Sequence, residues 1–219
     1  MGKTDKTTEK KFSRFSVPLG LLDYVNPIMY SVTVITVLIY TFSPMGVPYN
    51  IIMLIGAVIS ILFGFAIPTG KVLVGLGKIK FVMPVSLVFC VNTGILLSGL
   101  MLFRYVMALD WFILVAVAAV IIAALAVIYF KTKKLNTIAV LTGAFGYLLI
   151  YTSMITLSIR SGIVVPIVLY ALAIFLFVML CGIGIKADLK NPKVHWVIEI
   201  SNVTCQTLVA VATVILFSK

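Results

Sequence analysis

Seven long apolar runs constrain the fold of this chain more than any other feature of its sequence. Each run is about 20 residues long, which is the length of a helix that crosses the hydrocarbon core of a bilayer. Backbone polar groups inside lipid must pair within their own segment, and a helix achieves this. The sequence therefore predicts an all-α polytopic membrane protein with seven transmembrane helices. The expected spans are 27–43, 47–68, 82–103, 109–130, 137–158, 163–185 and 195–217.

The composition agrees with this class and excludes soluble ones. Of the 219 residues, 63% are hydrophobic and 11% are charged, whereas soluble domains have about 45–50% and about 25%. Seven spans use most of the chain, so no room remains for a soluble catalytic domain. We expect a single membrane domain at 27–217, preceded by a basic cytoplasmic tail and interfacial segment at 1–26.

The positive charges predict the orientation of the chain. Of the 17 lysines and arginines, all but Arg104, Arg160 and Lys219 lie in the tail or in the second, fourth and sixth loops. Lysine and arginine are retained on the cytoplasmic side, so we expect the N-terminus inside and the C-terminus outside. The net charge of +11 thus reflects membrane orientation and not nucleic-acid binding. The expected location is a bacterial cytoplasmic (inner) membrane.

Three short similarities suggest an internal duplication, because they recur in the same order. Apolar helices also resemble one another by chance, so both explanations stay open. The matching pairs are LIYT at 38–41 and 149–152, Val-Pro at 47–48 and 165–166, and the ungapped pair 81–103 and 195–217.

A duplication would give two half-repeats, 27–103 and 137–217, joined by a linker helix at 109–130. A single helix between them makes both halves cross the membrane in the same direction. The linker has no polar residue between Trp111 and Tyr129, so we expect it to face lipid. This three-one-three parallel arrangement resembles, in topology, that of SWEET-type sugar facilitators and PnuC-type vitamin transporters.

PnuC-type carriers also have a WxxWxxN motif. The nearest string in this chain is Trp196-x-x-Glu199-x-x-Asn202, in which a carboxylate replaces the second tryptophan. The resemblance is therefore one of topology, and no substrate follows from it.

The last span carries the most informative polar pattern. His195, Glu199, Asn202 and Gln206 follow one another at helical spacing and so form one stripe. Glu199 is the one carboxylate that the expected spans place deep in the bilayer, where an ionised carboxylate costs at least about 2.5–3.5 kcal/mol. We interpret the stripe as a solute-coordinating face in which Glu199 and His195 share or exchange a proton. The alternative is that these groups hydrogen-bond neighbouring helices and fix their packing.

Asn92 is the counterpart of Gln206 in the proposed duplication. Two amides at equivalent depth could line one central cavity, since carrier sites lie at the repeat interface near the midplane. Tyr40 and Tyr151 are also repeat-related and are expected toward the outer ends of their spans, as interfacial anchors or as an outer gate.

Other features have structural interpretations. Small residues spaced by four let helices approach closely, and we assign this packing role to two groups of them. Lys71, Lys78 and Lys80 are expected in a loop against lipid headgroups. The groups of small residues are Gly56, Ser60 and Gly64 in the second span, and Gly94 and Ser98 in the third.

The predicted function is a membrane carrier for a small polar solute, with or without coupling to protons, whose site lies between the two three-helix halves. The predicted substrate-binding residues are Glu199, His195, Asn202, Gln206 and Asn92. A non-transporting sensor, or an integral subunit of a larger complex, is the alternative. A carrier should have an aqueous cavity that reaches Glu199. A non-transporting protein should instead bury the polar stripe against other helices, without water.

No enzyme activity is expected, because the chain has one histidine and none of the usual catalytic strings. Its three cysteines lack the spacing of a metal site, and we expect neither a metal nor a cofactor. The expected partners are the lipid bilayer and a small-molecule solute, with oligomerisation left open.

Overall fold

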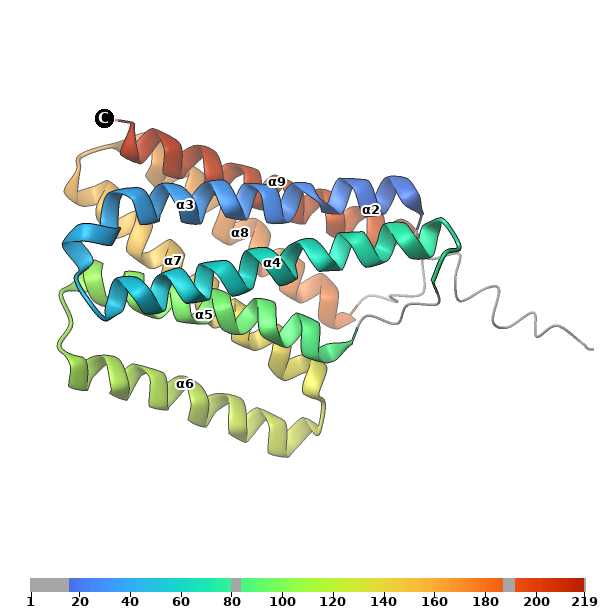
Figure 1. The fold of residues 1–219 in the computed structure, drawn as a ribbon, viewed down its shortest axis with the longest axis horizontal. Coiled ribbons are helices and arrows are strands. Elements are labelled where there is room, and N and C mark those ends of the chain that lie inside the picture. Colours follow the sequence, from blue (N-terminus) through green and yellow to red (C-terminus); the bar gives the residue numbers. More distant parts are fainter. Residues whose placement is uncertain (1–15, 80–83, 187–191, 219) are drawn as a thin grey trace, which may run out of the picture.

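The computed structural model describes residues 16–79, 84–186 and 192–218, and the secondary structure in these ranges is entirely helical (Figure 1). Most of the predicted basic tail, together with Lys80 and Lys190, lies outside the described residues. The helices are α2 (Val17–Asp23), α3 (Val25–Met45), α4 (Tyr49–Gly75), α5 (Val85–Met107), α6 (Trp111–Thr132), α7 (Leu135–Arg160), α8 (Val164–Lys186) and α9 (Pro192–Phe217).

The helix lengths confirm the prediction of a helical membrane protein. Six helices of the described chain are long and apolar enough to cross a bilayer. Helix α8 adds a shorter described apolar stretch, Val164–Leu180. Most of the expected spans coincide with observed helices to within a few residues.

The first span begins ten residues earlier than the sequence analysis expects. Helices α2 and α3 follow each other directly and together make one candidate span, Val17–Met45. Ser16 caps α2 by accepting a hydrogen bond from the Leu19 amide, and Pro18 lies in the first turn. The predicted start of the first span at residue 27 is therefore too late. Pro27 fits because it also lies in the first turn of α3.

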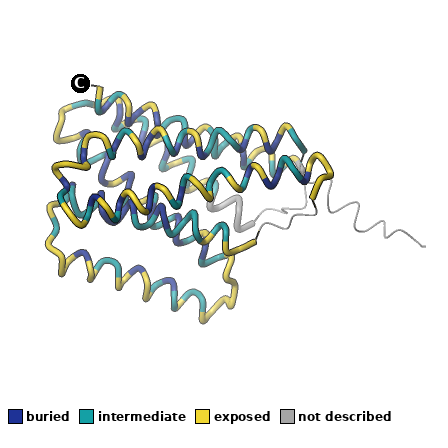
Figure 2. The backbone as a smooth tube through the Cα atoms, viewed as in Figure 1, coloured by how far each residue is buried: buried dark blue, intermediate teal, exposed yellow. Residues whose placement is uncertain are grey.

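Six helices form a closed ring in the order α3, α4, α5, α7, α8 and α9, with α9 returning to α3. Helix α6 stands outside the ring and contacts α7 and α5 (Figure 1). Its buried residues, Leu114, Ile121 and Leu125, form a single stripe, and the rest of its surface is mostly exposed (Figure 2). This exposed apolar surface is what the prediction of a lipid-facing helix requires.

Small residues bring neighbouring helices into close contact, as the sequence predicts for α4 and α5. A Cβ atom added at Gly94 would lie 2.5 Å from the Gly56 carbonyl oxygen. The Ser60 hydroxyl crosses the same interface to the Val91 carbonyl at 3.3 Å. Helices α5 and α7 pack equally closely at Gly99 and Gly146, and this second interface was not predicted.

Candidate functional site

Three ionisable side chains meet inside the helical bundle at the end of α2. The Lys71 ammonium on α4 lies 2.7 Å from Asp23 Oδ2 on α2 and also bonds Glu199 Oε1 on α9. The three residues are 6–9% exposed. We call this group, Asp23, Lys71 and Glu199, the ion cluster.

Asn26 completes the ion cluster from the first turn of α3. Its side-chain amide donates to Asp23 Oδ1 at 2.8 Å and to Glu199 Oε2 at 3.4 Å. The side-chain oxygen of Asn26, Oδ1, is buried without a hydrogen-bond partner among the described residues. Helices α2, α3, α4 and α9 are thus joined at one point by charged and polar groups.

The ion cluster contains more acid than base. With all three groups ionised, two carboxylates share one ammonium, and the cluster carries a net charge of −1. All three residues belong to candidate membrane spans, where uncompensated charge is expensive. A proton taken up by either carboxylate would cancel this charge. The cluster is therefore a chemically reasonable place for a proton to bind and leave.

Two members of the ion cluster were missed by sequence reasoning. The prediction that Lys71 lies in a surface loop is wrong, because α4 continues to Gly75 and buries it. Glu199 is not the only carboxylate inside a span, because Asp23 lies in the same candidate span as α3. The detectable signal was Asp23 itself, a single acid in the apolar string VPLGLLDYV.

The predicted stripe on α9 does not act as one unit. Glu199 belongs to the ion cluster, and the cation that it contacts there is Lys71. His195 lies one turn before it and is half-buried, as is Asn202. Gln206 is 5% exposed and lies seven residues beyond Glu199, which is about 10 Å along a helix.

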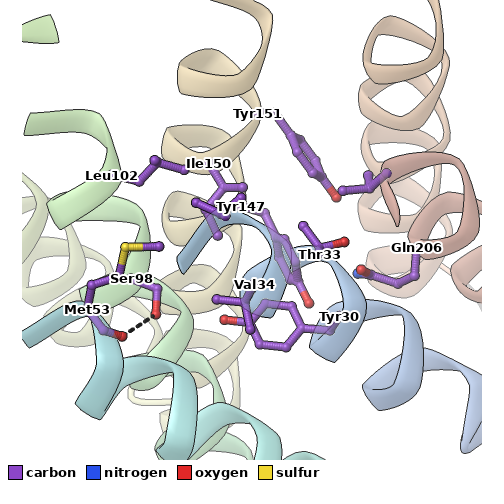
Figure 3. Close-up of a pocket in the computed structure, with 12 residues that line it drawn as sticks. Tyr30, Thr33, Val34, Met53, Ser98, Leu102, Tyr147, Ile150, Tyr151 and Gln206 are labelled. Atoms are coloured by element: carbon purple, nitrogen blue, oxygen red, sulfur yellow. Dashed lines mark hydrogen bonds between the residues drawn. The ribbon is translucent and has the colours of Figure 1, made fainter. Parts of the chain in front are cut away.

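Gln206 lines a small cavity at the centre of the bundle. The cavity has a volume of about 10 Å³, which is room for about one water molecule. Five helices contribute to its wall, namely α3, α4, α5, α7 and α9 (Figure 3). The lining residues are Tyr30, Thr33, Val34, Val37, Met53, Ser98, Leu102, Tyr147, Ile150, Tyr151, Gln206 and Val209.

Tyrosines dominate the wall of the cavity. The Tyr30 and Tyr147 rings meet edge to face with centroids 6.3 Å apart, and Tyr147 stacks on Tyr151 at 5.8 Å. Thr33, Tyr147 and Gln206 point their polar ends toward one another (Figure 3). Sequence reasoning named Tyr151 only as an anchor or an outer gate, and it missed Tyr30 and Tyr147. Tyr147 was the available signal, because it lies at the middle of its span, where interfacial anchoring does not explain it.

The Tyr30 hydroxyl is buried beside the Ser60 and Ser98 hydroxyls, but outside normal hydrogen-bond geometry with either of them. It makes no hydrogen bond within the part of the chain that the structure describes. The neighbouring hydroxyls of Ser60 and Ser98 donate to the carbonyls of Gly56 and Met53. Buried polar groups are nearly always hydrogen-bonded, so this hydroxyl indicates a place for a water molecule or a ligand atom.

Asn92 does not share the cavity with Gln206. It is half-buried, and its side-chain amide donates to the Ala139 carbonyl on α7 at 2.8 Å. The side chain also lies against Gly143, where an added Cβ atom would overlap Asn92 Oδ1. Asn92 therefore connects α5 to α7, which agrees with the alternative interpretation that such polar groups fix helix packing.

This placement predicts that Asn92→Ala changes stability and not ligand binding. The lost interhelical hydrogen bond should lower the free energy of unfolding by roughly 0.6–2 kcal/mol. Thermal unfolding in detergent measures this change. A loss of solute binding at unchanged stability would instead show that Asn92 is a solute-binding residue. Asn136→Ala, near the exposed start of α7, is the matched control.

The tyrosine pair Tyr40 and Tyr151 is also divided between two environments. Tyr40 is 52% exposed and stacks on Phe217 at the end of α9, with centroids 4.8 Å apart. Tyr151 is fully buried in the cavity wall. The two residues therefore do not form one gate in this conformation.

The described residues contain no group of three or more His, Cys, Asp or Glu side chains placed to hold a metal ion. The site thus consists of two parts along α9, the ion cluster around Glu199 and the tyrosine-lined cavity around Gln206. The cavity wall does not include Glu199. No family model, no curated protein and no solved structure matches this chain.

Proposed function

We propose that this protein is a proton-coupled membrane carrier for a small polar solute. The observation that carries the proposal is the buried ion cluster, with two carboxylates on one ammonium inside the membrane spans. In this proposal the solute occupies the central cavity at Gln206, and Glu199 with Asp23 holds the coupling proton. The solute crosses without chemical conversion.

The ion cluster joins the two parts of the ring that a carrier must move. We take α3, α4 and α5, with α2 leading into them, as the first half, and α7, α8 and α9 as the second half. Asp23 and Lys71 belong to the first half, and Glu199 to the second. Separating the halves at this end breaks the contact between Lys71 and Glu199, and protonation of Glu199 weakens that contact beforehand.

The order of the helices in the ring supports the duplication that the sequence suggests. Exchanging the halves turns α3 into α7, α4 into α8, and α5 into α9. The contact between α3 and α9 then becomes the contact between α7 and α5, and both contacts are present. The cavity lies between the halves, which is where carriers with parallel repeats hold their solutes.

The charge pattern supports the orientation of the carrier. With the N-terminus inside, the ion cluster lies toward the cytoplasmic end of the bundle and the Tyr40–Phe217 stack toward the outside. The closed cluster then corresponds to a state sealed toward the cytoplasm. A bacterial inner membrane is the location that we propose.

A non-transporting sensor, or a subunit of a larger complex, is the second candidate. The observation that favours it is the burial of the polar groups away from water. Lys71 contacts Glu199 directly, and the cavity has room for about one water molecule. A carrier passes through such a closed state, whereas a scaffold remains in it. Only a measurement of transport separates the two candidates.

The test is proton flux in proteoliposomes that contain a pH indicator and carry a pH gradient. Four separate solute pools are added outside, namely amino acids, monosaccharides, nucleobases and aromatic carboxamides. We expect one pool to accelerate the change of internal pH over that in protein-free liposomes. Glu199→Gln should abolish this pool-dependent flux, because an amide cannot exchange the proton.

The control variant is Asp110→Asn, which neutralises an exposed carboxylate at the start of α6 and should leave the flux unchanged. Labelled solute uptake is measured in parallel. Uptake without proton movement would contradict the coupling alone. If no pool is taken up and none shifts the unfolding temperature, the carrier proposal fails and the second candidate replaces it.

A further inference from the structure

We propose that the central cavity binds an uncharged aromatic solute with one hydrogen-bonding edge, such as an aromatic carboxamide. This inference rests on the proposed function, because it names the class of solute that the carrier would take. It depends on three features of the cavity, which are its aromatic wall, its few polar groups and its lack of charged side chains.

The wall favours an aromatic ring. Tyr30, Tyr147 and Tyr151 enclose the cavity from α3 and α7, with Met53 on the α4 side. The edge-to-face and stacked contacts among these tyrosines are those that aromatic groups prefer. A bound ring can replace one such contact with an equivalent one, and thioethers also pack well against ring edges.

The polar groups are few and favour one short edge on the solute. Gln206 offers both a donor and an acceptor from one planar amide, and it faces the Tyr147 hydroxyl. The unpartnered Tyr30 hydroxyl lies on the Ser98 side of the cavity (Figure 3). A primary carboxamide on a ring matches the Gln206 amide edge to edge. A sugar, with hydroxyls on every side, would leave most of them unpaired against the aliphatic wall.

The lining has no charged side chain, which disfavours ionic solutes and most of all anions. None of the twelve lining residues is acidic or basic apart from the tyrosine hydroxyls. The nearest charges described on the same helix face belong to the ion cluster, about two turns away along α9. An anion in the cavity would therefore lose its water without gaining a partner, and a cation would gain only the faces of the tyrosine rings.

The present volume shows that binding must accompany a conformational change. The cavity of about 10 Å³ is far smaller than the sites that hold small molecules. The tyrosine rings occupy the space that the solute would take. Separation of the two halves at α3 and α7 opens this space, and a solute that prefers the open form shifts the equilibrium toward it.

The experiment measures binding of four matched probes to the full chain in lipid nanodiscs, by saturation-transfer NMR with empty nanodiscs subtracted. The probes are benzamide, benzoate, benzamidine and cyclohexanecarboxamide. The first three probes share one planar shape and differ in charge, whereas cyclohexanecarboxamide keeps the carboxamide on a saturated ring. We expect benzamide to bind at least about fivefold more tightly than each of the other three, the ratio that one buried polar contact provides.

Two variants locate the binding. Tyr30→Phe removes only the unpartnered hydroxyl, so it should leave the unfolding temperature unchanged or higher. Gln206→Met keeps the length of the side chain and removes the amide. Each should weaken benzamide binding by about fivefold. Tyr40→Phe is the matched control, because Tyr40 is exposed on the same helix as Tyr30.

The outcomes separate this inference from the proposed function. Equal binding of cyclohexanecarboxamide, tighter binding of benzoate or benzamidine, or no binding of any probe would overturn the inference. Pool-dependent proton flux carried by another solute class would then still support the carrier. Benzamide binding that both variants weaken, without any flux, would instead keep the cavity as a ligand site and overturn the carrier.

Discussion

Replacing Lys71 with methionine is expected to lower the free energy of unfolding by roughly 3–5 kcal/mol, because it leaves two buried carboxylates without their shared cation. Asp23 and Glu199 would face each other across a site that is less than a tenth exposed. The measurement is chemical or thermal unfolding in detergent, followed by circular dichroism. A fall in the unfolding temperature should accompany the loss.

Two comparisons identify the cause of that loss. Lys78→Met changes an exposed lysine just beyond the end of α4 and should have little effect. The triple variant Asp23→Asn, Lys71→Met and Glu199→Gln removes all three charges together and should recover most of the stability, since a neutral replacement of a buried ion group is often tolerated. Equal stability of the Lys71 and Lys78 variants would contradict the ion cluster.

Replacing Gly146 with alanine is expected to lower the free energy of unfolding by about 3 kcal/mol, at the upper end of overpacking effects. A Cβ atom at this position would lie 2.7 Å from the Leu96 amide nitrogen and 2.8 Å from the Ile95 carbonyl carbon. Both are backbone atoms of α5, so they cannot move aside as a side chain does. Helices α5 and α7 must separate, and unfolding in detergent measures the result.

The matched control for Gly146 is Gly64→Ala on α4. There the nearest atom to an added Cβ would be Pro27 Cβ at 3.4 Å, an ordinary van der Waals contact. Alanine also favours a helix over glycine by up to about 1 kcal/mol. We therefore expect this variant to be as stable as the original chain or slightly more stable. A similar loss in both variants would show that the packing of α5 on α7 is not special.

The two predictions test different links between the same halves. Lys71 joins the halves through its charge contacts with the end of α2 and with Glu199 on α9, whereas Gly146 joins them through backbone contact between α5 and α7. A carrier needs the first contact to be reversible. The second is suited to a permanent hinge, because small residues allow close approach without a charge to compensate.

Part of the site could be predicted from the sequence because it depends on one helix alone. The polar stripe on the last span identified Glu199 and Gln206 as inward-facing, and both are buried. Helical spacing was sufficient for this. Spacing could not say that the two residues serve different places, since that depends on which other helices lie opposite each of them.

The sequence by itself determined the class of this protein. Apolar runs of the length that spans a bilayer can only be helices there, because lipid offers no partners for free backbone groups. The same local rules placed the small residues that bring α4 and α5 together, and the exposed surface of α6.

Only the tertiary structure decided which charges meet. Lys71 and Glu199 are 128 positions apart, and hydropathy assigned Lys71 to a loop because a lysine near the end of an apolar run resembles a membrane-surface residue. The ring of helices places two carboxylates around Lys71, and their negative charge offsets the cost of burying its ammonium group. The environment of an ionisable side chain is set by its neighbours in space, and a local pattern does not contain them.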